Sequence, residues 1–264
     1  MSSFVPPGAA KDASALPTAV AAPAAILPLV GDAYRFVLNR LPIFAEMAVV
    51  PLAAILLAEY VGALLERGVI GYVLAALLRS AALIVFGSVV FVRWHRFVLL
   101  GEVTRGVERL FGPGWRPFAT ALLILTAIPL VYLAAASLLV VVYVGLLLLA
   151  IAPLLGIAFA LASVRVALVF PAASIERPLG WGEAWALAAG HYLKLLGGGV
   201  LCAAPFGIAF VLLHVIGERA WTIVWMVTEA LALAVTYVGG AVCATYVSEL
   251  YRRIVPGAPI ATVR

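Results

Sequence analysis

The stretch PFATALLILTAIPLVYLAAASLLVVVYVGLLLLAIAPLLGIAFALASV, residues 117–164, has no charged side chain over 48 residues, and Arg116 and Arg165 bound it. An α-helix rises about 1.5 Å per residue, so one helix of this length would measure roughly 72 Å, more than twice the ~30 Å hydrocarbon core of a bilayer. The segment must therefore turn back, which predicts two antiparallel transmembrane helices with both arginines on one side of the membrane. We expect the turn near residues 137–143, because it leaves two arms of about 20 residues, each long enough to cross.

The composition extends this prediction to the whole chain. Of its 264 residues, 66% are hydrophobic and 11% are charged, and the mean hydropathy is +1.19. A soluble globular domain has about 45–50% apolar and about 25% charged residues, so these residues cannot cover a water-exposed surface. The length leaves room for about six spans and no separate soluble domain. Cys202 and Cys243 lie in apolar runs, and we interpret both as small core residues.

The chain divides into a membrane domain and two tails. Residues 1–25, rich in Ala, Pro and Ser, lack the pattern of a secretory signal and are predicted to be a disordered tail. Residues 26–254 form the predicted membrane domain, and residues 255–264 a short C-terminal tail. Besides the opening pair, the predicted spans cover residues 41–65, 68–92, 197–216 and 221–246.

Amphipathic segments before the spans predict helices that lie in the headgroup region, and the helix of the 68–92 span is predicted to continue past the membrane into one of them, residues 93–112. The apolar stripes, at i, i+3, i+4 and i+7 or similar spacing, are Tyr34, Val37, Leu38 and Leu41 in residues 26–40; Val103, Val107, Leu110 and Phe111 in residues 93–112; and Trp185, Ala188, Ala189 and Tyr192 in residues 181–194. The tetrapeptides GDAY, from Gly31, and GEAW, from Gly182, open two of these segments in the same way. The pattern predicts an all-α bundle of three repeated units, each a surface helix followed by a helical hairpin, inserted the same way up.

The basic residues predict the orientation. Fourteen of the 17 Lys and Arg residues fall on the face that would carry both termini and the two long connections. The opposite face would carry only Arg67 and Arg219, while Arg79 lies within a span. Positive residues remain on the cytoplasmic side, so both termini are predicted to be cytoplasmic.

The GDAY and GEAW segments, the six-span plan and the passage ALVFPAASIERPLGWGEAWALAAGHYLKLL, residues 167–196, together resemble a known group. They are similar to the YciC-type bacterial inner-membrane proteins and to the related membrane domain of glycerophosphoryl diester phosphodiesterases, over most of the chain after Ala25. The resemblance implies a multi-pass protein of the bacterial inner (cytoplasmic) membrane, and it offers no catalytic residues to carry over. The soluble domain that accompanies some relatives is not recognisable in the sequence, so phosphodiesterase activity is not expected.

Charged residues inside the spans are the first candidate site. A charge at the centre of a membrane helix costs about 2.5–3.5 kcal/mol, so it normally has a partner. Arg79 and Glu229 lie at matching depths, which predicts a pair that is either a structural tie between spans or part of a mid-membrane substrate site. Glu46 lies near the inner end of its span, within reach of the basic residues Arg93, His95 and Arg96.

The predicted cytoplasmic face is a second candidate, because each Lys or Arg near an anionic membrane contributes about 1 kcal/mol of attraction. The lipid-headgroup candidates are Arg93, Arg96, Arg105, Arg109 and Lys194. The positive-inside rule alone also accounts for these residues. Nucleic acid is not an expected partner, because the charges are dispersed and the net charge is only +5.

Small residues at every fourth position, Gly199, Ala203 and Gly207, predict a close approach of another helix, either within the protein or across a homo-oligomer seam. The sequence shows no nucleotide-binding loop, nucleophile elbow or metalloprotease motif, and its three histidines are far apart. We therefore expect no catalytic residue, metal site or cofactor.

The sequence favours a non-catalytic membrane protein that organises lipid or partner membrane proteins. The alternative is a transporter or channel for a small solute, with a polar site at Arg79 and Glu229 in proline-interrupted spans. An accessory subunit of a larger membrane complex fits the same residues.

Overall fold

The computed structural model describes residues 25–66, 68–104, 110–140, 145–177, 179–218 and 222–258. Within these ranges the chain is all-helical, as predicted, and no residue is in a strand. The helices are α1 (Ile26–Asn39), α2 (Leu41–Leu65), α3 (Gly68–Leu100), α4 (Trp115–Val140), α5 (Gly145–Val166), α6 (Val169–Ser174), α7 (Trp181–Ala189), α8 (Tyr192–Glu218) and α9 (Thr222–Ile254). The tails outside these ranges, including most of the predicted N-terminal tail, lie outside the described residues.

Within the described ranges, four helices, α2, α3, α8 and α9, are long and apolar enough to cross a membrane. The bounds of α2 and the start of α3 agree with the predicted spans. In contrast, α8 begins at Tyr192 and α9 continues to Ile254, so both extend beyond the predicted apolar segments. The extensions carry charged residues that pack at one end of the bundle, which hydropathy alone does not register.

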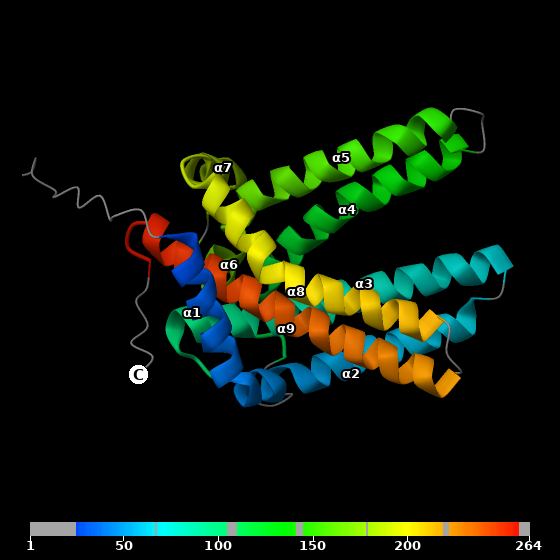
Figure 1. Cartoon of the computed structure of the whole chain (residues 1–264), viewed down its shortest axis with the longest axis horizontal. Helices are drawn as coiled ribbons and strands as arrows, with labels where there is room; N and C mark the ends of the chain where they lie inside the picture. The colour runs from blue at the N-terminus through cyan, green and yellow to red at the C-terminus, as the bar shows by residue number, and fades with distance from the viewer. Residues whose placement is uncertain are drawn as a thin grey trace, which may run out of the picture.

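Helices that are consecutive in the chain pack against each other: α2 against α3, α4 against α5, and α8 against α9. Figure 1 shows α4 and α5 leaving the other long helices at an angle, so that they come close to them only at one end. The helix α4 ends at Val140 and α5 begins at Gly145. The predicted turn therefore falls partly on residues 141–144, which lie outside the described residues.

The most densely packed part of the protein is one end of the bundle, here called the base: α1, α6, α7, the last turns of α3 and α9, and the start of α8 (Figure 1). Trp94 of α3 is completely buried there, and its indole Nε1 donates to Ala241 O (3.0 Å) and Thr245 Oγ1 (2.9 Å) of α9. The rings of Phe36 and Phe44 meet the Trp94 ring edge-on. One tryptophan thus joins α1, α2, α3 and α9.

The predicted continuation of the 68–92 helix through residues 93–112 is confirmed up to Leu100, and the interfacial stripe predicted within it is wrong. The part up to Leu100 belongs to α3 and is mostly buried in the base instead of lying on a surface. The helix then ends, because Gly101 adopts a left-handed conformation (φ 73°), which favours glycine and commonly terminates helices. Residues 101–104 are not helical, and Arg105 to Arg109 lie outside the described residues, so the predicted stripe is not one helix face.

The helices α1 and α7 both form as predicted, but each buries only part of its predicted stripe, Val37 in α1 and Ala188 in α7. In α1 the buried residues are Leu29, Val30, Ala33 and Val37, which face α8 and α9, while Leu38 is 58% exposed. In α7 the buried residues are Ala184 and Ala188, and Trp185 remains exposed. Small residues allow close packing on a neighbouring helix, so the larger apolar side chains are left on the outer side.

Away from the base, the four long helices expose large apolar side chains. Val69 and Ile70 at the start of α3, Ile208 in α8 and Ile223 in α9 are 64–83% exposed. Such a surface is unsuited to water and suits a lipid environment.

Candidate functional site

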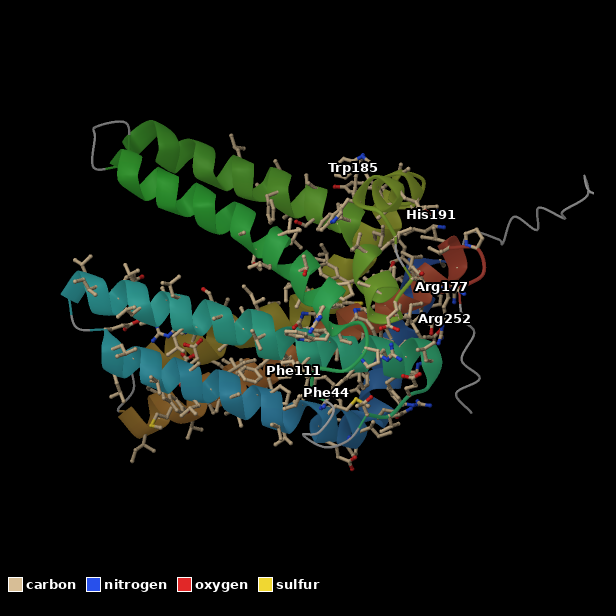
Figure 2. The ribbon with its side chains drawn as sticks, turned by 180° about the vertical axis from the view of Figure 1, so that it is seen from behind. Phe44, Phe111, Arg177, Trp185, His191 and Arg252 are labelled. Atoms are coloured by element: carbon tan, nitrogen blue, oxygen red, sulfur yellow. The ribbon has the colours of Figure 1, made fainter. Side chains whose placement is uncertain are left out.

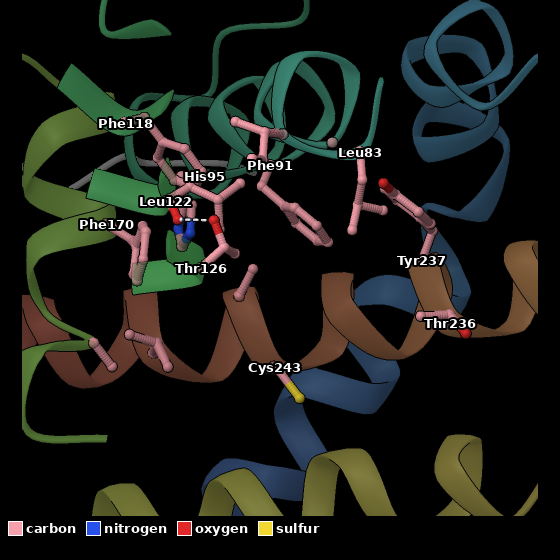
Figure 3. A pocket seen from close by; sticks show the side chains of 15 residues that line it. Leu83, Phe91, His95, Phe118, Leu122, Thr126, Phe170, Thr236, Tyr237 and Cys243 are labelled. Atoms are coloured by element: carbon pink, nitrogen blue, oxygen red, sulfur yellow. Dashed lines mark hydrogen bonds between the residues drawn. The ribbon is translucent and has the colours of Figure 1, made fainter. Parts of the chain in front are cut away.

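An apolar cleft lies between α3, α4 and α9, and α6 closes it on the base side (Figure 3). The cleft is partly open and holds about 340 Å³. Ligand pockets commonly enclose about 300–1,000 Å³, so this volume is at the lower end of that range. Its walls include Leu83 and Phe91 from α3, Phe118 and Leu122 from α4, and Phe170 from α6.

The cleft exists because α4 diverges from α3 and α9. At its start α4 is held by two contacts: the ring of Phe118 lies 5.0 Å from the ring of Phe170, and Trp115 Nε1 donates to Val85 O of α3 at 3.4 Å. Farther along, α4 moves away from α3 (Figure 1), and side chains line the space between them. Along α3 the lining runs from Leu83 to His95, which corresponds to roughly 18 Å of helix.

Four polar side chains line the cleft, and they differ in their hydrogen-bond partners. The hydroxyls of Thr126 and Thr236 donate to carbonyls of their own helices, Leu122 O and Ala232 O, each at 2.8 Å. Tyr237 stacks on Phe91 and directs its hydroxyl towards Gly87.

His95 is the fourth, at the base end of the cleft, and its side chain is only 4% exposed. Its Nδ1 lies 2.7 Å from Ser248 Oγ of α9, and its ring lies 5.8 Å from the ring of Phe118. Among the described residues, the other ring nitrogen, Nε2, has no hydrogen-bond partner. The sequence analysis considered His95 only as a neighbour of Glu46, because a single histidine in the run RWHRF does not reveal a cavity formed by three distant segments.

Arg79 does not pair with Glu229, as matching depths had predicted, but with two carboxylates of its own helix pair. Its Nε lies 2.9 Å from Glu59 Oε2, and its Nη1 contacts the Glu66 carboxylate. Gly62 provides the space, because a Cβ there would come within 2.7 Å of Arg79 Nε. Depth along a helix is readable from sequence, whereas the direction in which a side chain points is not.

Glu229 of α9 instead faces α8, where His214 Nδ1 lies 3.3 Å from its Oε1. Close to these charges, the Tyr60 hydroxyl of α2 donates to Met226 O of α9 at 2.9 Å and so joins the two helices. The Arg79 and Glu229 side chains are 26% and 25% exposed, so neither group is sealed from its surroundings. Both groups join neighbouring helices, which is what structural ties do.

Most of the predicted headgroup residues that the structure describes are engaged within the protein. Arg93 is 5% exposed and donates to Met47 O (3.2 Å), which leaves it no surface for a headgroup. Arg96 binds Glu102 (Nε to Oε2, 2.9 Å) and Ser174 O (2.9 Å).

The remaining candidates are less constrained. Lys194 is half-buried at the start of α8, and Glu46 is exposed on α2. Arg105 and Arg109 lie outside the described residues. Arg165, which was not among the predicted headgroup residues, has its guanidinium over the rings of Trp185 (4.7 Å) and Tyr192 (5.0 Å).

The predicted close approach at Gly199, Ala203 and Gly207 does not form with any part of the chain that the structure describes. A Cβ at Gly199 or Gly207 would meet no atom within 4 Å, and Ala203 is exposed. The contact between α8 and α9 is made at Gly198 instead, against the ring of Tyr246.

Among the described residues, no group of three or more His, Cys, Asp or Glu side chains is arranged to hold a metal ion. No family model matches the chain, and no curated protein or solved structure matches it. The function therefore has to be argued from the cleft and its surroundings.

Proposed function

We propose that this chain is a non-catalytic integral protein of the bacterial inner membrane that organises membrane lipid, with an acyl chain held in the cleft between α3, α4 and α9. The cleft is the observation that carries this proposal. It is elongated, apolar and partly open, and it lies among helices able to cross a membrane. An acyl chain has the matching shape and chemistry, whereas a polar solute would find few partners.

The proposal includes six crossings in three hairpin units, with both termini cytoplasmic. The helices α4 and α5 have 26 and 22 residues, so each has the length that a bilayer requires. In Figure 2 the labelled side chains of Arg177, His191 and Arg252 lie at the base. A base rich in basic residues is expected on the cytoplasmic side. Membership of the YciC-type group is consistent with this arrangement and stays a prediction.

Selectivity in such a cleft cannot come from the hydrophobic effect. A lipid chain leaving the bilayer for an apolar cleft exchanges one apolar environment for another, so little hydrophobic free energy is gained. Shape and hydrogen bonding then determine which lipid is retained. The protein would act by retaining particular lipids beside it.

A matched pair of substitutions on α4 tests the proposal. Leu122 lines the cleft, and its neighbour Leu123 is 51% exposed and does not. Leu122→Trp should fill the cleft and reduce crosslinking to a phosphatidylglycerol carrying a diazirine on its acyl chain by about fivefold or more, whereas Leu123→Trp should leave it unchanged. Crosslinked peptides identified by mass spectrometry must come from α3, α4 or α9. Equal labelling of both variants would disprove occupancy of the cleft.

Transport of a small solute remains the second candidate, and the partly exposed charges at Arg79 and Glu229 are the observation in its favour. We favour lipid organisation, because each charge pairs with a neighbouring helix and the apolar cleft is lined by other residues. Substituting both residues, Arg79→Gln with Glu229→Gln, should leave lipid crosslinking in the cleft unchanged. Loss of that crosslinking would connect the charges to the cleft and favour a shared pathway.

A further inference from the structure

The base end of the cleft carries a hydrogen-bonding group that the fold leaves unused. His95 is buried against Phe118, and its Nε2 has no partner among the described residues. His95 lines the cleft, so a ring nitrogen without a protein partner there is available to a ligand, an ion or water. The other walls at this end are apolar, so the ring nitrogen distinguishes this end of the cleft chemically.

The contact with Ser248 is compatible with either neutral tautomer of His95, and we consider the tautomer in which the serine hydroxyl donates to Nδ1. Ser248 is completely buried, and its hydroxyl has His95 Nδ1 as its hydrogen-bond partner, at 2.7 Å. A hydroxyl that donates its proton to Nδ1 satisfies both groups. The neutral imidazole then carries its own proton on Nε2, which makes Nε2 a hydrogen-bond donor available at the cleft.

The remainder of the cleft determines what the ligand looks like. From His95 the lining continues along α3 to Leu83, roughly 18 Å away, through apolar side chains. A matching ligand has an acceptor oxygen at one end and a long hydrocarbon chain. A carboxylate is a poor match, because a buried charge beside a neutral imidazole and apolar walls would be uncompensated. An uncharged ester carbonyl is a good match.

We propose that the cleft binds one acyl chain of a glycerophospholipid, with the ester carbonyl oxygen accepting a hydrogen bond from His95 Nε2–H and the chain extending from the base towards Leu83. This inference rests on the proposed function and adds the ligand class, its direction and the anchoring residue. Ser248 is a positioning residue, since it acts through the tautomer of His95. The hydroxyl of Tyr237, near Gly87, lies about eight residues farther along α3, roughly 12 Å from His95, and does not meet the ester.

The test compares probes with and without the ester oxygen on the purified full chain in detergent. The probes are phosphatidylglycerol with a diazirine on one acyl chain, and hexadecane with a diazirine. His95→Phe should lower labelling by the phospholipid about fivefold, the loss of one neutral hydrogen bond, and leave labelling by the hydrocarbon unchanged. Tyr237→Phe should change neither. Equal effects of His95→Phe on both probes, or no effect on either, would overturn the proposal.

Two further variants separate anchoring from folding. His95→Gln retains an N–H donor and should restore most of the labelling that His95→Phe loses, while Ser248→Ala should lower it without removing the imidazole. Diazirine-bearing palmitic acid tests the ligand class, and stronger labelling by the acid than by the phospholipid would refute the ester assignment. The Leu122→Trp variant keeps the two proposals distinct. If it lowers phospholipid labelling and His95→Phe does not, the cleft holds lipid and only the anchor is wrong.

Discussion

At the scale of single residues, the packing of α8 on α9 depends on which glycine faces the partner helix. Gly198 and Gly199 are adjacent in the same helix. A Cβ at Gly198 would overlap the ring of Tyr246, which is completely buried and donates its hydroxyl to Lys194 O at 2.6 Å. A Cβ at Gly199 would meet nothing within 4 Å. The two positions therefore have opposite tolerance for a methyl group.

We predict that Gly198→Ala destabilises the protein by about 1–3 kcal/mol, because a buried ring anchored by a hydrogen bond cannot move aside without cost. Gly199→Ala should be neutral or stabilising by up to about 1 kcal/mol, since alanine has the higher helix propensity. Thermal unfolding of both variants in the same detergent, followed by circular dichroism, measures the difference. A Gly199→Ala variant as unstable as Gly198→Ala would contradict the observed packing.

The sequence correctly predicted that small residues of α8 allow a close approach of another helix, but it predicted the wrong residues for that contact. Gly199, Ala203 and Gly207 have the regular spacing that favours helix approach, whereas the contact is made by a glycine outside that pattern. The same limitation affected Arg79 and His95. Composition and spacing locate a residue along its helix, but its direction depends on neighbours that are distant in the sequence.

At the scale of elements, the apolar segments were predictable and the packing at their ends was not. Hydropathy located α2 and the start of α3 closely, because an uninterrupted apolar run has few other structures available. It placed residues 93–100 on a surface, since arginines and a histidine interrupt the run. In the structure these residues are satisfied by partners from other helices, such as Met47 O for Arg93 and Ser248 for His95.

The packing of α1 against α8 can be tested by measuring how the stability of the protein depends on pH. Tyr34 donates its hydroxyl to Cys202 O at 3.0 Å on α8, and partial burial raises the pKa of the Tyr34 phenol above its ordinary value of 10.0. A raised pKa in the folded state means that folding favours the protonated phenol, so this stabilisation is complete below pH 10.0 and is lost as the pH rises through the folded-state pKa.

We therefore predict that, as the pH rises above about 10, the native protein loses stability more steeply than Tyr34→Phe, which has no phenol to ionise. Unfolding midpoints of both proteins across this range provide the measurement. The exposed Tyr72, 65% exposed on α3, supplies the matched control, and Tyr72→Phe should follow the native protein. Parallel slopes for the native protein and Tyr34→Phe would show that Tyr34 does not couple α1 docking to pH.

At the scale of the whole molecule, the protein consists of two parts that suit different surroundings: the base and the far halves of the long helices. The base is packed like the interior of a soluble protein, with Trp94 and Tyr251 at most 1% exposed. The halves of the long helices away from the base resemble the lipid-facing surface of a membrane protein. In the most apolar segment of α8, only 6% of the residues are buried within the protein. So many exposed apolar side chains need lipid around them. The boundary between the base and the far halves of the long helices should therefore coincide with one face of the bilayer.

This division makes the six-crossing topology testable with single cysteines. Gly180 is the exposed residue directly before α7 of the base, and a Cβ added there would meet no atom within 4 Å, whereas Val69 lies at the opposite end of α3. In intact cells, a membrane-impermeant maleimide should label Val69→Cys and not Gly180→Cys, and permeabilisation should expose the latter. The native chain is the control, since Cys202 is buried and Cys243 is half-buried. Tyr143→Cys, between α4 and α5, should label together with Val69→Cys, because α4 and α5 would cross the bilayer and return. Labelling of Tyr143→Cys only after permeabilisation would leave the protein with four crossings, and the wall that α4 contributes to the cleft would no longer lie in the membrane.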